Sequence, residues 1–266
     1  MKIKFTKMQS CGNDYVYIDC IAKDGFDFDG FTSNQIKDLV VRLSKQHYGI
    51  GSDGVIFICK SDVADAKMRM FNADGSEGRM CGNGIRCVAK YVHDNYAKKR
   101  QLNIETLSGI KNILIDKDKI TVNMGKAKID ASKTECLGYK VTCIDMGNPH
   151  CVVFQKDIDN IDLAVIGPKF ENHAMFTPDR VNTEFAEIVD KDTLKMRVWE
   201  RGSGETLACG TGACAVAVAG VLNGHYKKGE NINVLLKGGN LIINYTDGCV
   251  LMTGDAQKVF EGVIEI

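Results

Sequence analysis

One strand–loop–helix segment occurs twice in this chain, and the repetition strongly limits the folds it can adopt. Residues 68–89 align without a gap with residues 196–217, a shift of 128 positions, and eight of the aligned pairs are identical. Cys81 and Cys209 are one of these pairs. A shorter echo, Gly12-Asn13-Asp14 and Gly147-Asn148-Pro149, precedes each copy at a slightly different offset. We interpret the repeat as the product of a domain duplication.

The composition excludes several classes of protein. Hydrophobic residues make up 44% and charged residues 26% of the chain, as in ordinary globular proteins. Lys+Arg and Asp+Glu are equal at 34 each, which favours neither nucleic acid nor a membrane surface as partner. The sequence begins without a signal-like apolar segment. We therefore expect a cytoplasmic protein with no nucleic-acid and no membrane partner.

The eleven cysteines form no recognisable metal or disulfide framework. No Cys-x-x-Cys pair occurs, and no His/Cys cluster has the spacing of zinc ligands. Most of these residues should be small buried hydrophobes, and no metal site is predicted.

Hydrophobic periodicity predicts a mixed α+β protein. The apolar faces of three segments predict helices over residues 34–46, 84–97 and 212–222, the last of them enclosed on every side. Short turns favour antiparallel hairpins over βαβ crossovers. The predicted strands are Val55–Cys59, Lys67–Phe71, Leu102–Thr106, Asn112–Asp116, Ile120–Met124, Lys140–Asp145, Cys151–Phe154, Leu194–Trp199, Asn233–Leu236, Leu241–Tyr245 and Val250–Thr253.

Both copies of the repeat place a Cys-Gly-x-Gly motif immediately before a predicted helix. Cys81 and Cys209 therefore lie where unpaired N–H groups and the helix dipole favour an anion. The pKa of such thiols falls to roughly 3.5–7.5. The backbone of Gly82-Asn83 and of Gly210-Thr211 could also hold a carboxylate.

Two such thiols in matching halves suit the inversion of a stereocentre. One thiolate removes a proton from one face of a carbon, and the second group, a neutral thiol, delivers a proton to the other face. The scheme requires neither a metal nor a pyridoxal cofactor. These residues thus predict a cofactor-independent amino-acid epimerase with Cys81 and Cys209 as the catalytic pair.

The sequence resembles the diaminopimelate epimerase family over nearly its whole length. The matching stretches follow the family's order, and the last is long and specific. They are Gly12-Asn13-Asp14-Tyr15, Phe71–Glu77, Met80–Gly84, Gly147–His150, Asn182–Phe185 and Trp199–Ala213.

The resemblance assigns roles to individual residues. Cys81 and Cys209 would be catalytic, and Glu200 and His150 would support catalysis near the reacting amino group. The substrate-binding residues would be Asn13, Asn72, Gly82, Asn83, Asn148, Asn182, Glu200, Arg201, Gly210 and Thr211.

The resemblance also implies a fold and a reaction. Two pseudo-symmetric domains, residues 1–126 with the C-terminal strand 257–266 and residues 127–256, would each wrap mainly antiparallel strands round a central helix, with the active site in the cleft between them. The enzyme would convert LL-diaminopimelate into meso-diaminopimelate for lysine and peptidoglycan precursors. A homodimer is compatible with the family.

One position departs from the family pattern. Many relatives carry a substrate-contacting Gln where this chain has Gly54, so that contact is not carried over. The same stretch, Gly49–Gly54, spells a dinucleotide fingerprint, but it follows a helix and precedes a strand, the reverse of the required context.

Three other functions stay open at this point. A proline or hydroxyproline racemase would usually carry His where Asn83 follows the first Cys-Gly. A thiol redox or metal-binding module would bind metal in a simple assay. A non-catalytic amino-acid-binding protein would incorporate no solvent deuterium into its ligand.

The matched positions of the two thiols predict the effect of their removal. Cys81→Ala and Cys209→Ala should each fold normally and lose epimerase activity by several orders of magnitude. Cys11→Ala, Cys20→Ala and Cys136→Ala should keep turnover within about tenfold, because buried cysteines act as small hydrophobes. A near-normal rate in either of the first two variants would refute the two-thiol mechanism.

Overall fold

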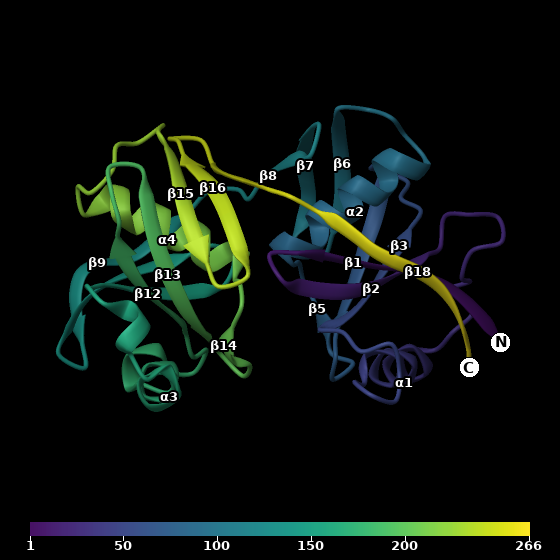
Figure 1. Cartoon of the computed structure of the whole chain (residues 1–266), viewed down its shortest axis with the longest axis horizontal. Helices are drawn as coiled ribbons and strands as arrows, with labels where there is room; N and C mark the ends of the chain where they lie inside the picture. The colour runs from purple at the N-terminus through teal and green to yellow at the C-terminus, as the bar shows by residue number, and fades with distance from the viewer. The chain divides into compact units, whose positions relative to one another are not determined.

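The computed structural model covers residues 1–266 and describes every side chain except those of residues 131–133. The chain divides into two compact units. The N-terminal unit comprises Met1–Val122 and Asp255–Ile266, and the C-terminal unit comprises Asn123–Gly254. The last strand, β18 (Gln257–Glu265), lies alongside β1 (Lys2–Ser10) at the edge of the N-terminal unit (Figure 1). The chain therefore begins and ends in the same unit.

The remaining elements of the N-terminal unit alternate strands with two helices. They are β2 (Asn13–Asp19), α1 (Ser33–Ser44), β3 (Gly54–Cys59), β4 (Ala66–Asn72), β5 (Glu77–Gly78), α2 (Gly82–Asn95), β6 (Gln101–Thr106), β7 (Gly109–Asp116) and β8 (Lys119–Asn123).

The C-terminal unit repeats this order. Its elements are β9 (Lys128–Cys136), β10 (Tyr139–Asp145), β11 (Pro149–Phe154), η1 (Ile158–Asn160), α3 (Leu163–Glu171), η2 (Ala174–Phe176), β12 (Asn182–Ile188), β13 (Thr193–Glu200), β14 (Gly204–Thr206), α4 (Gly210–Leu222), β15 (Asn231–Leu236), β16 (Gly239–Tyr245) and β17 (Val250–Gly254).

Strand pairing is the same in the two units. The N-terminal order β18-β1-β2-β3-β4-β6-β7-β8 corresponds to β9-β10-β11-β12-β13-β15-β16-β17 in the C-terminal unit. Short strands β5 and β14 add a hairpin to β4 and β13 respectively. The fold is thus α+β with two pseudo-symmetric domains, as the repeat predicts.

Hairpins do not account for all of the pairing. In each unit two pairs are parallel, β2 with β3 and β4 with β6, and equivalently β11 with β12 and β13 with β15. A helix bridges each parallel pair, because parallel strands cannot be joined by a tight turn. The preference for hairpins over βαβ crossovers is therefore wrong for these four connections.

One helix in each unit is buried among the strands. Helix α4 contacts strands β10, β11, β12, β13, β15, β16 and β17, and nearly all its residues are buried. Helix α2 likewise contacts β1, β2, β4, β6 and β7. The small apolar residues of α4 allow the strands to approach from every side, as its composition predicts.

The outer helix of each unit is amphipathic or capped. Helix α1 begins with a capping box between Thr32 and Gln35 and buries Ile36, Leu39 and Leu43 against the sheet. Full burial of such a side chain stabilises the fold by about 1.5–3 kcal/mol. Helix α3 begins at Asp162, whose side chain accepts the N–H of Val165.

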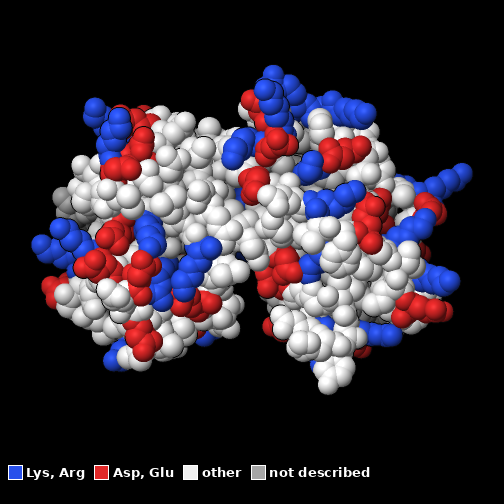
Figure 2. Space-filling view, in the orientation of Figure 1, with Lys and Arg blue, Asp and Glu red and all other residues white. Residues whose placement is uncertain are grey.

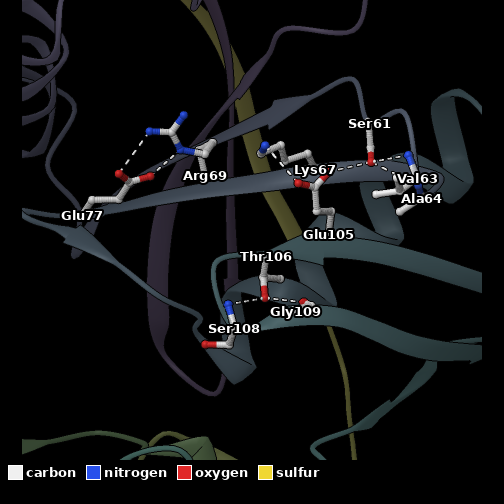
Figure 3. Close-up of polar contacts among 10 residues, drawn as sticks. All are labelled: Ser61, Val63, Ala64, Lys67, Arg69, Glu77, Glu105, Thr106, Ser108 and Gly109. Atoms are coloured by element: carbon white, nitrogen blue, oxygen red, sulfur yellow. Dashed lines mark hydrogen bonds and ion pairs between the residues drawn. The ribbon is translucent and has the colours of Figure 1, made fainter.

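An arginine–glutamate pair holds the hairpin that precedes each buried helix. Arg69 on β4 contacts Glu77 on β5 through two hydrogen bonds, one of them 3.0 Å from Nη2 to Oε2 (Figure 3). Arg197 and Glu205 repeat the pair on β13 and β14, with bonds of 2.8 and 3.1 Å. The planar guanidinium matches a carboxylate in this bidentate geometry. Two of the repeated identities therefore fix the approach of the chain to each cysteine.

The surface carries both signs of charge. Lys/Arg and Asp/Glu side chains are interspersed on the visible face of each unit (Figure 2). In the described part of the chain, no helix is long and apolar enough to cross a membrane.

Candidate active site

Each catalytic candidate is the N-cap of a buried helix. Cys81 precedes α2 in extended conformation, and its Sγ accepts the N–H of Gly84 at 3.3 Å. Cys209 precedes α4 in the same conformation and accepts the N–H of Gly212 at the same distance. The sulfur thus replaces the oxygen acceptor of an ordinary cap. The two units present equivalent thiols at equivalent helix N-termini.

The Cys81 half-site is built from β2 and the loop before β3. The Sγ of Cys81 lies 3.3 Å from Oδ1 of Asn13, whose Nδ2 donates to Asp53 at 2.6 Å. Burial, together with the neighbouring Cys81 and Asp53 groups, raises the pKa of the Tyr15 phenol well above its usual range. Burial also raises the pKa of the Asp53 carboxyl. Asn13 is therefore fixed beside the thiol by the carboxyl group of Asp53.

A fully buried arginine fixes the start of α2. Arg86 donates to the carbonyl of Gly82 at 3.1 Å and to Oδ1 of Asn83 at 2.7 Å. It also donates to the carbonyl of Asp255 at 3.1 Å and contacts the hydroxyl of Ser10. The side chain of Asn83 and the carbonyl of Gly82 are therefore both held by Arg86.

The surroundings of Cys209 contain more carboxyl groups than those of Cys81. Thr211 Oγ1 lies 3.4 Å from the sulfur of Cys209, and Glu200 accepts the hydroxyl of Thr206 at 2.5 Å. Burial raises the pKa of the Glu200 carboxyl, while hydrogen bonds from Thr206 and Cys209 oppose the rise. Glu200 and Cys209 are thus direct neighbours.

The expected low pKa is wrong for Cys209. Burial, followed by the charges of Glu200 and Glu184, raises the pKa of this thiol well above its usual range. The hydrogen bonds from Thr211 and from the N–H of Gly212 act in the opposite direction but are weaker. Desolvation and two acidic neighbours therefore outweigh the helix N-terminus, and Cys209 rests as a neutral thiol.

His150 and Glu184 form a pair in the interior of the same half-site. Nδ1 of His150 lies 2.6 Å from Oε1 of Glu184, and both side chains are fully buried. Asn182 lies opposite His150 in the parallel β11–β12 pairing and accepts the backbone N–H of Arg201 at 2.9 Å. Four residues expected at the site, His150, Asn182, Glu200 and Cys209, are therefore held within one unit.

The remaining predicted residues lie at strand ends and in turns. Asn72 ends β4 and donates to Ser76 at 3.0 Å, and Arg201 follows β13 and donates to the carbonyl of Asp179 at 2.5 Å. Asn148 is half-buried in the turn before β11. The hydrogen bonds of Asn72 and Arg201 thus lie within their own units.

The duplication relates the residues around the two thiols. Both units use the same strand pairs, so positions with the same register correspond. The corresponding pairs are Tyr15 and His150, Gly54 and Asn182, Ile56 and Glu184, and Asn72 and Glu200.

Four site residues were not found by sequence reasoning, namely Tyr15, Asp53, Arg86 and Glu184. Tyr15, Asp53 and Glu184 lie inside quoted motifs or directly beside them, but their types are common in turns and strands. For Glu184 a signal exists: an acidic residue stands where the first copy of the repeat has Ile56. Among the side chains that the structure describes, no group of three or more His, Cys, Asp or Glu could hold a metal ion.

Comparison with solved structures defines a class of related folds. A PhzF-family phenazine biosynthesis protein of Bacillus anthracis has a TM-score of 0.74 at 17% identity, covering 100% of both chains. A hydroxyproline epimerase of Agrobacterium vitis has a TM-score of 0.70 at 14% identity, covering 99% of this chain and 92% of the other. At such identities these structures show the shared two-domain fold alone.

Comparison of sequences narrows the class. The family model described as diaminopimelate epimerase matches residues 5–129 and 142–259. Diaminopimelate epimerases of Acetivibrio thermocellus and Methanococcus maripaludis are each 46% identical over 99% of this chain, covering 99% and 100% of their own lengths. The chain belongs to the diaminopimelate epimerase family and is an isomerase.

The structure explains the departure at Gly54. A Cβ at this position would lie 2.0 Å from the carbonyl oxygen of Phe71 and 2.8 Å from Cε1 of Tyr15. Because backbone cannot move aside as a flexible side chain can, a larger residue has no room there. The ring of Tyr15 fills part of the space that a glutamine at position 54 would need.

Gly54→Gln should therefore destabilise the protein and not restore a substrate contact. We expect the free energy of unfolding in urea to fall by roughly 1–3 kcal/mol, the usual cost of overpacking. Gly248→Ala is the matched control, because a Cβ there would meet only Thr246 Oγ1 at 3.9 Å. Equal stability of the two variants would contradict the account of Gly54.

Proposed function

We propose that this protein converts LL-diaminopimelate into meso-diaminopimelate with two cysteines and without a metal or organic cofactor. The observation that carries the proposal is the pair of thiols, Cys81 and Cys209, at equivalent N-termini of duplicated buried helices. Membership of the diaminopimelate epimerase family indicates that diaminopimelate is the substrate. The reaction would serve lysine and peptidoglycan precursor synthesis. It would take place in the cytoplasm, where thiols stay reduced.

The first turns of the two helices provide the carboxylate site. Backbone N–H groups of Gly82-Asn83 and Gly210-Thr211 would bind the carboxylate of the reacting centre and stabilise the charge that develops on it. Within each unit these groups belong to a buried helix, so their position relative to the cysteine of that unit is fixed.

The proton moves between two faces of one carbon. A thiolate takes the α-proton and becomes a thiol, and the carbanion takes a proton from the second thiol, which becomes a thiolate. Burial and the neighbouring carboxyl groups favour the thiol form of Cys209 in the protein without substrate. Each direction of the reaction would use one cysteine as the base and the other as the acid. The thiols titrate as a coupled pair in such a cycle.

The amide and guanidinium groups would recognise the rest of the substrate. Diaminopimelate carries an ammonium and a carboxylate at each end, so it needs donors and acceptors together. Asn13 and Asn148 supply both kinds of group, and Asn72, Asn182 and Arg201 would bind the distal end. Glu200 and His150 would act on the reacting ammonium group.

Incubation with LL-diaminopimelate in deuterated water tests the proposal. The meso product should carry deuterium at the inverted α-carbon, because the donated proton comes from a thiol that exchanges with solvent. L-Proline and trans-4-hydroxy-L-proline serve as control substrates and should remain unlabelled. A chain that binds diaminopimelate but produces neither meso isomer nor labelled substrate would be a binding protein.

A homodimer through β18 is part of the proposal. Three apolar side chains of this edge strand, Val259, Phe260 and Val263, are 56%, 46% and 60% exposed. An open hollow of about 1170 Å³ lies beside the strand, lined in part by Phe5 and Val263. Exposed apolar edge strands are covered in most native proteins.

Phe260→Glu should weaken this dimer, because it would bury a charge in an apolar contact. Sedimentation velocity should then show a shift from dimer to monomer. Val63→Glu, at an apolar residue that is 68% exposed outside β18, is the control and should leave the dimer intact. A wild-type chain that sediments as a monomer at micromolar concentration would rule the dimer out.

A further inference from the structure

The side chains of His150 and Glu184 are completely buried, although both carry polar atoms that normally need hydrogen-bond partners. Both side chains have no exposed surface, and the only polar contact they make with each other is the 2.6 Å bond between Nδ1 and Oε1. Among the side chains that the structure describes, Nε2 of His150 and Oε2 of Glu184 have no hydrogen-bond partner. Leaving two buried polar atoms unpaired costs about 1–3 kcal/mol each.

The fold itself does not require a glutamate at this position. The corresponding residue of the N-terminal unit is Ile56, which is fully buried in the same strand register. A Cβ on Gly84 would lie 2.7 Å from Cδ1 of Ile56, and a Cβ on Gly212 would lie 2.6 Å from Oε1 of Glu184. The two side chains therefore occupy the same place against the buried helix. Since the apolar side chain of Ile56 fills this position in the N-terminal unit, packing alone does not explain the carboxyl group of Glu184 in the C-terminal unit.

Glu184 lies beside the catalytic thiol of its own unit. The same Cβ position on Gly212 is 2.6 Å from Oε1 of Glu184 and 3.3 Å from Sγ of Cys209. The charge of Glu184 contributes to the raised pKa of that thiol and also raises the pKa of the Glu200 carboxyl. The pair is thus part of the Cys209 half-site and not of the general core.

We propose that Glu184 is a positioning residue that fixes the tautomer of His150. Its carboxylate accepts the Nδ1–H of the imidazole, so the proton stays on Nδ1 and Nε2 carries a lone pair. Which nitrogen of a histidine is protonated is set by the hydrogen bond that the other nitrogen makes. The inference rests on the proposed epimerisation, because in that reaction the lone pair on Nε2 would bind the substrate.

Nε2 of His150 accepts a hydrogen bond from the α-ammonium group of the substrate. An ammonium group offers three donors and no acceptor, so only a lone pair can bind it. Nε2 and Glu200 hold the ammonium, and the helix N-termini hold the carboxylate. The Cα–H bond is thereby oriented toward the sulfur of the cysteine that removes the proton. The opposite tautomer would present an N–H to the ammonium and turn the substrate away.

The tautomer can be measured in the wild-type protein without substrate. Long-range ¹H–¹⁵N correlation spectra distinguish the two neutral forms of histidine, and the chain has only five histidines. The spectrum of His150→Asn identifies the relevant signals. We expect His150 to carry its proton on Nδ1. A proton on Nε2 would overturn the inference whatever the enzyme's activity, so this result is separate from a failure of epimerisation.

Two substitutions test the consequence for catalysis. Glu184→Ile copies the residue of the N-terminal unit and removes the acceptor, and Glu184→Gln keeps the shape and a weaker, neutral acceptor. We expect kcat to fall by at least about a hundredfold in the first and about tenfold in the second, since misorientation affects the transition state most. KM should change less, because the distal contacts remain. In Glu184→Ile the proton of His150 should also move to Nε2.

Glu187→Gln is the matched control. Glu187 is on the same strand, but its separation of three residues places it on the other face, where it accepts the N–H of Ile158 at 3.4 Å. This variant should keep wild-type kcat and the wild-type histidine spectrum. A kcat within about threefold of wild type in Glu184→Ile would overturn the inference. If that variant does not fold, a wild-type kcat in Glu184→Gln would do so.

Discussion

The hydrogen bond from a glycine N–H to a cysteine sulfur at the start of a buried helix is the interaction on which the site depends. It fixes each sulfur at a helix N-terminus, where the remaining N–H groups are free to bind an anion. The strands that surround α2 and α4 bury these termini, and the Arg–Glu pairs fix the hairpins that lead into them. A thiol and a set of backbone N–H donors are thereby placed at the same point of each unit.

The duplication places Cys81 and Cys209 in two units of the same fold. Different side chains at a few corresponding positions give the two cysteines different chemical surroundings. Around Cys81 the corresponding positions hold Tyr15, Gly54 and Ile56, which carry no charge at neutral pH. Around Cys209 they hold His150, Asn182 and Glu184. An epimerase needs one thiolate and one thiol at the start of each turnover, and the reverse reaction exchanges these roles. The carboxyl groups near Cys209 favour the protonated sulfur there in the protein without substrate.

The sequence was sufficient for the elements that periodicity and capping determine. The helices α1, α2 and α4 and the eleven predicted strands are found within a few residues of their predicted bounds, whereas strands β1, β2, β9 and β12 were not predicted. Helix α3 was missed, because Pro168 lies inside it and its sequence LAVIGPKFE is apolar without a clear helical face. The parallel crossovers were missed because pairing partners distant in sequence leave no local signal.

The site was predictable only where a motif marks it. The cysteines and their glycines stand out in the repeat, but the pKa of Cys209 depends on burial and on the side chain of Glu184, a residue 25 positions away in the chain. No local pattern reports how many carboxyl groups converge on one thiol in three dimensions. The helix N-terminus is visible in the sequence, and the desolvation that outweighs it is not.

The balance of charge at Cys209 is compatible with a thiol of raised pKa as the proton donor of the proposed reaction. In the resting protein, Glu200 and Glu184 disfavour a second negative charge on the sulfur, so the thiol is a poor nucleophile toward oxidants. An ammonium group bound beside these carboxyl groups would offset their charge and make the thiol more acidic. Substrate binding would therefore adjust the donor toward the acidity that proton transfer requires, at the moment when the carbanion forms. A buried site with paired charges can protect a reactive sulfur and still activate it, provided that the substrate supplies the missing cation.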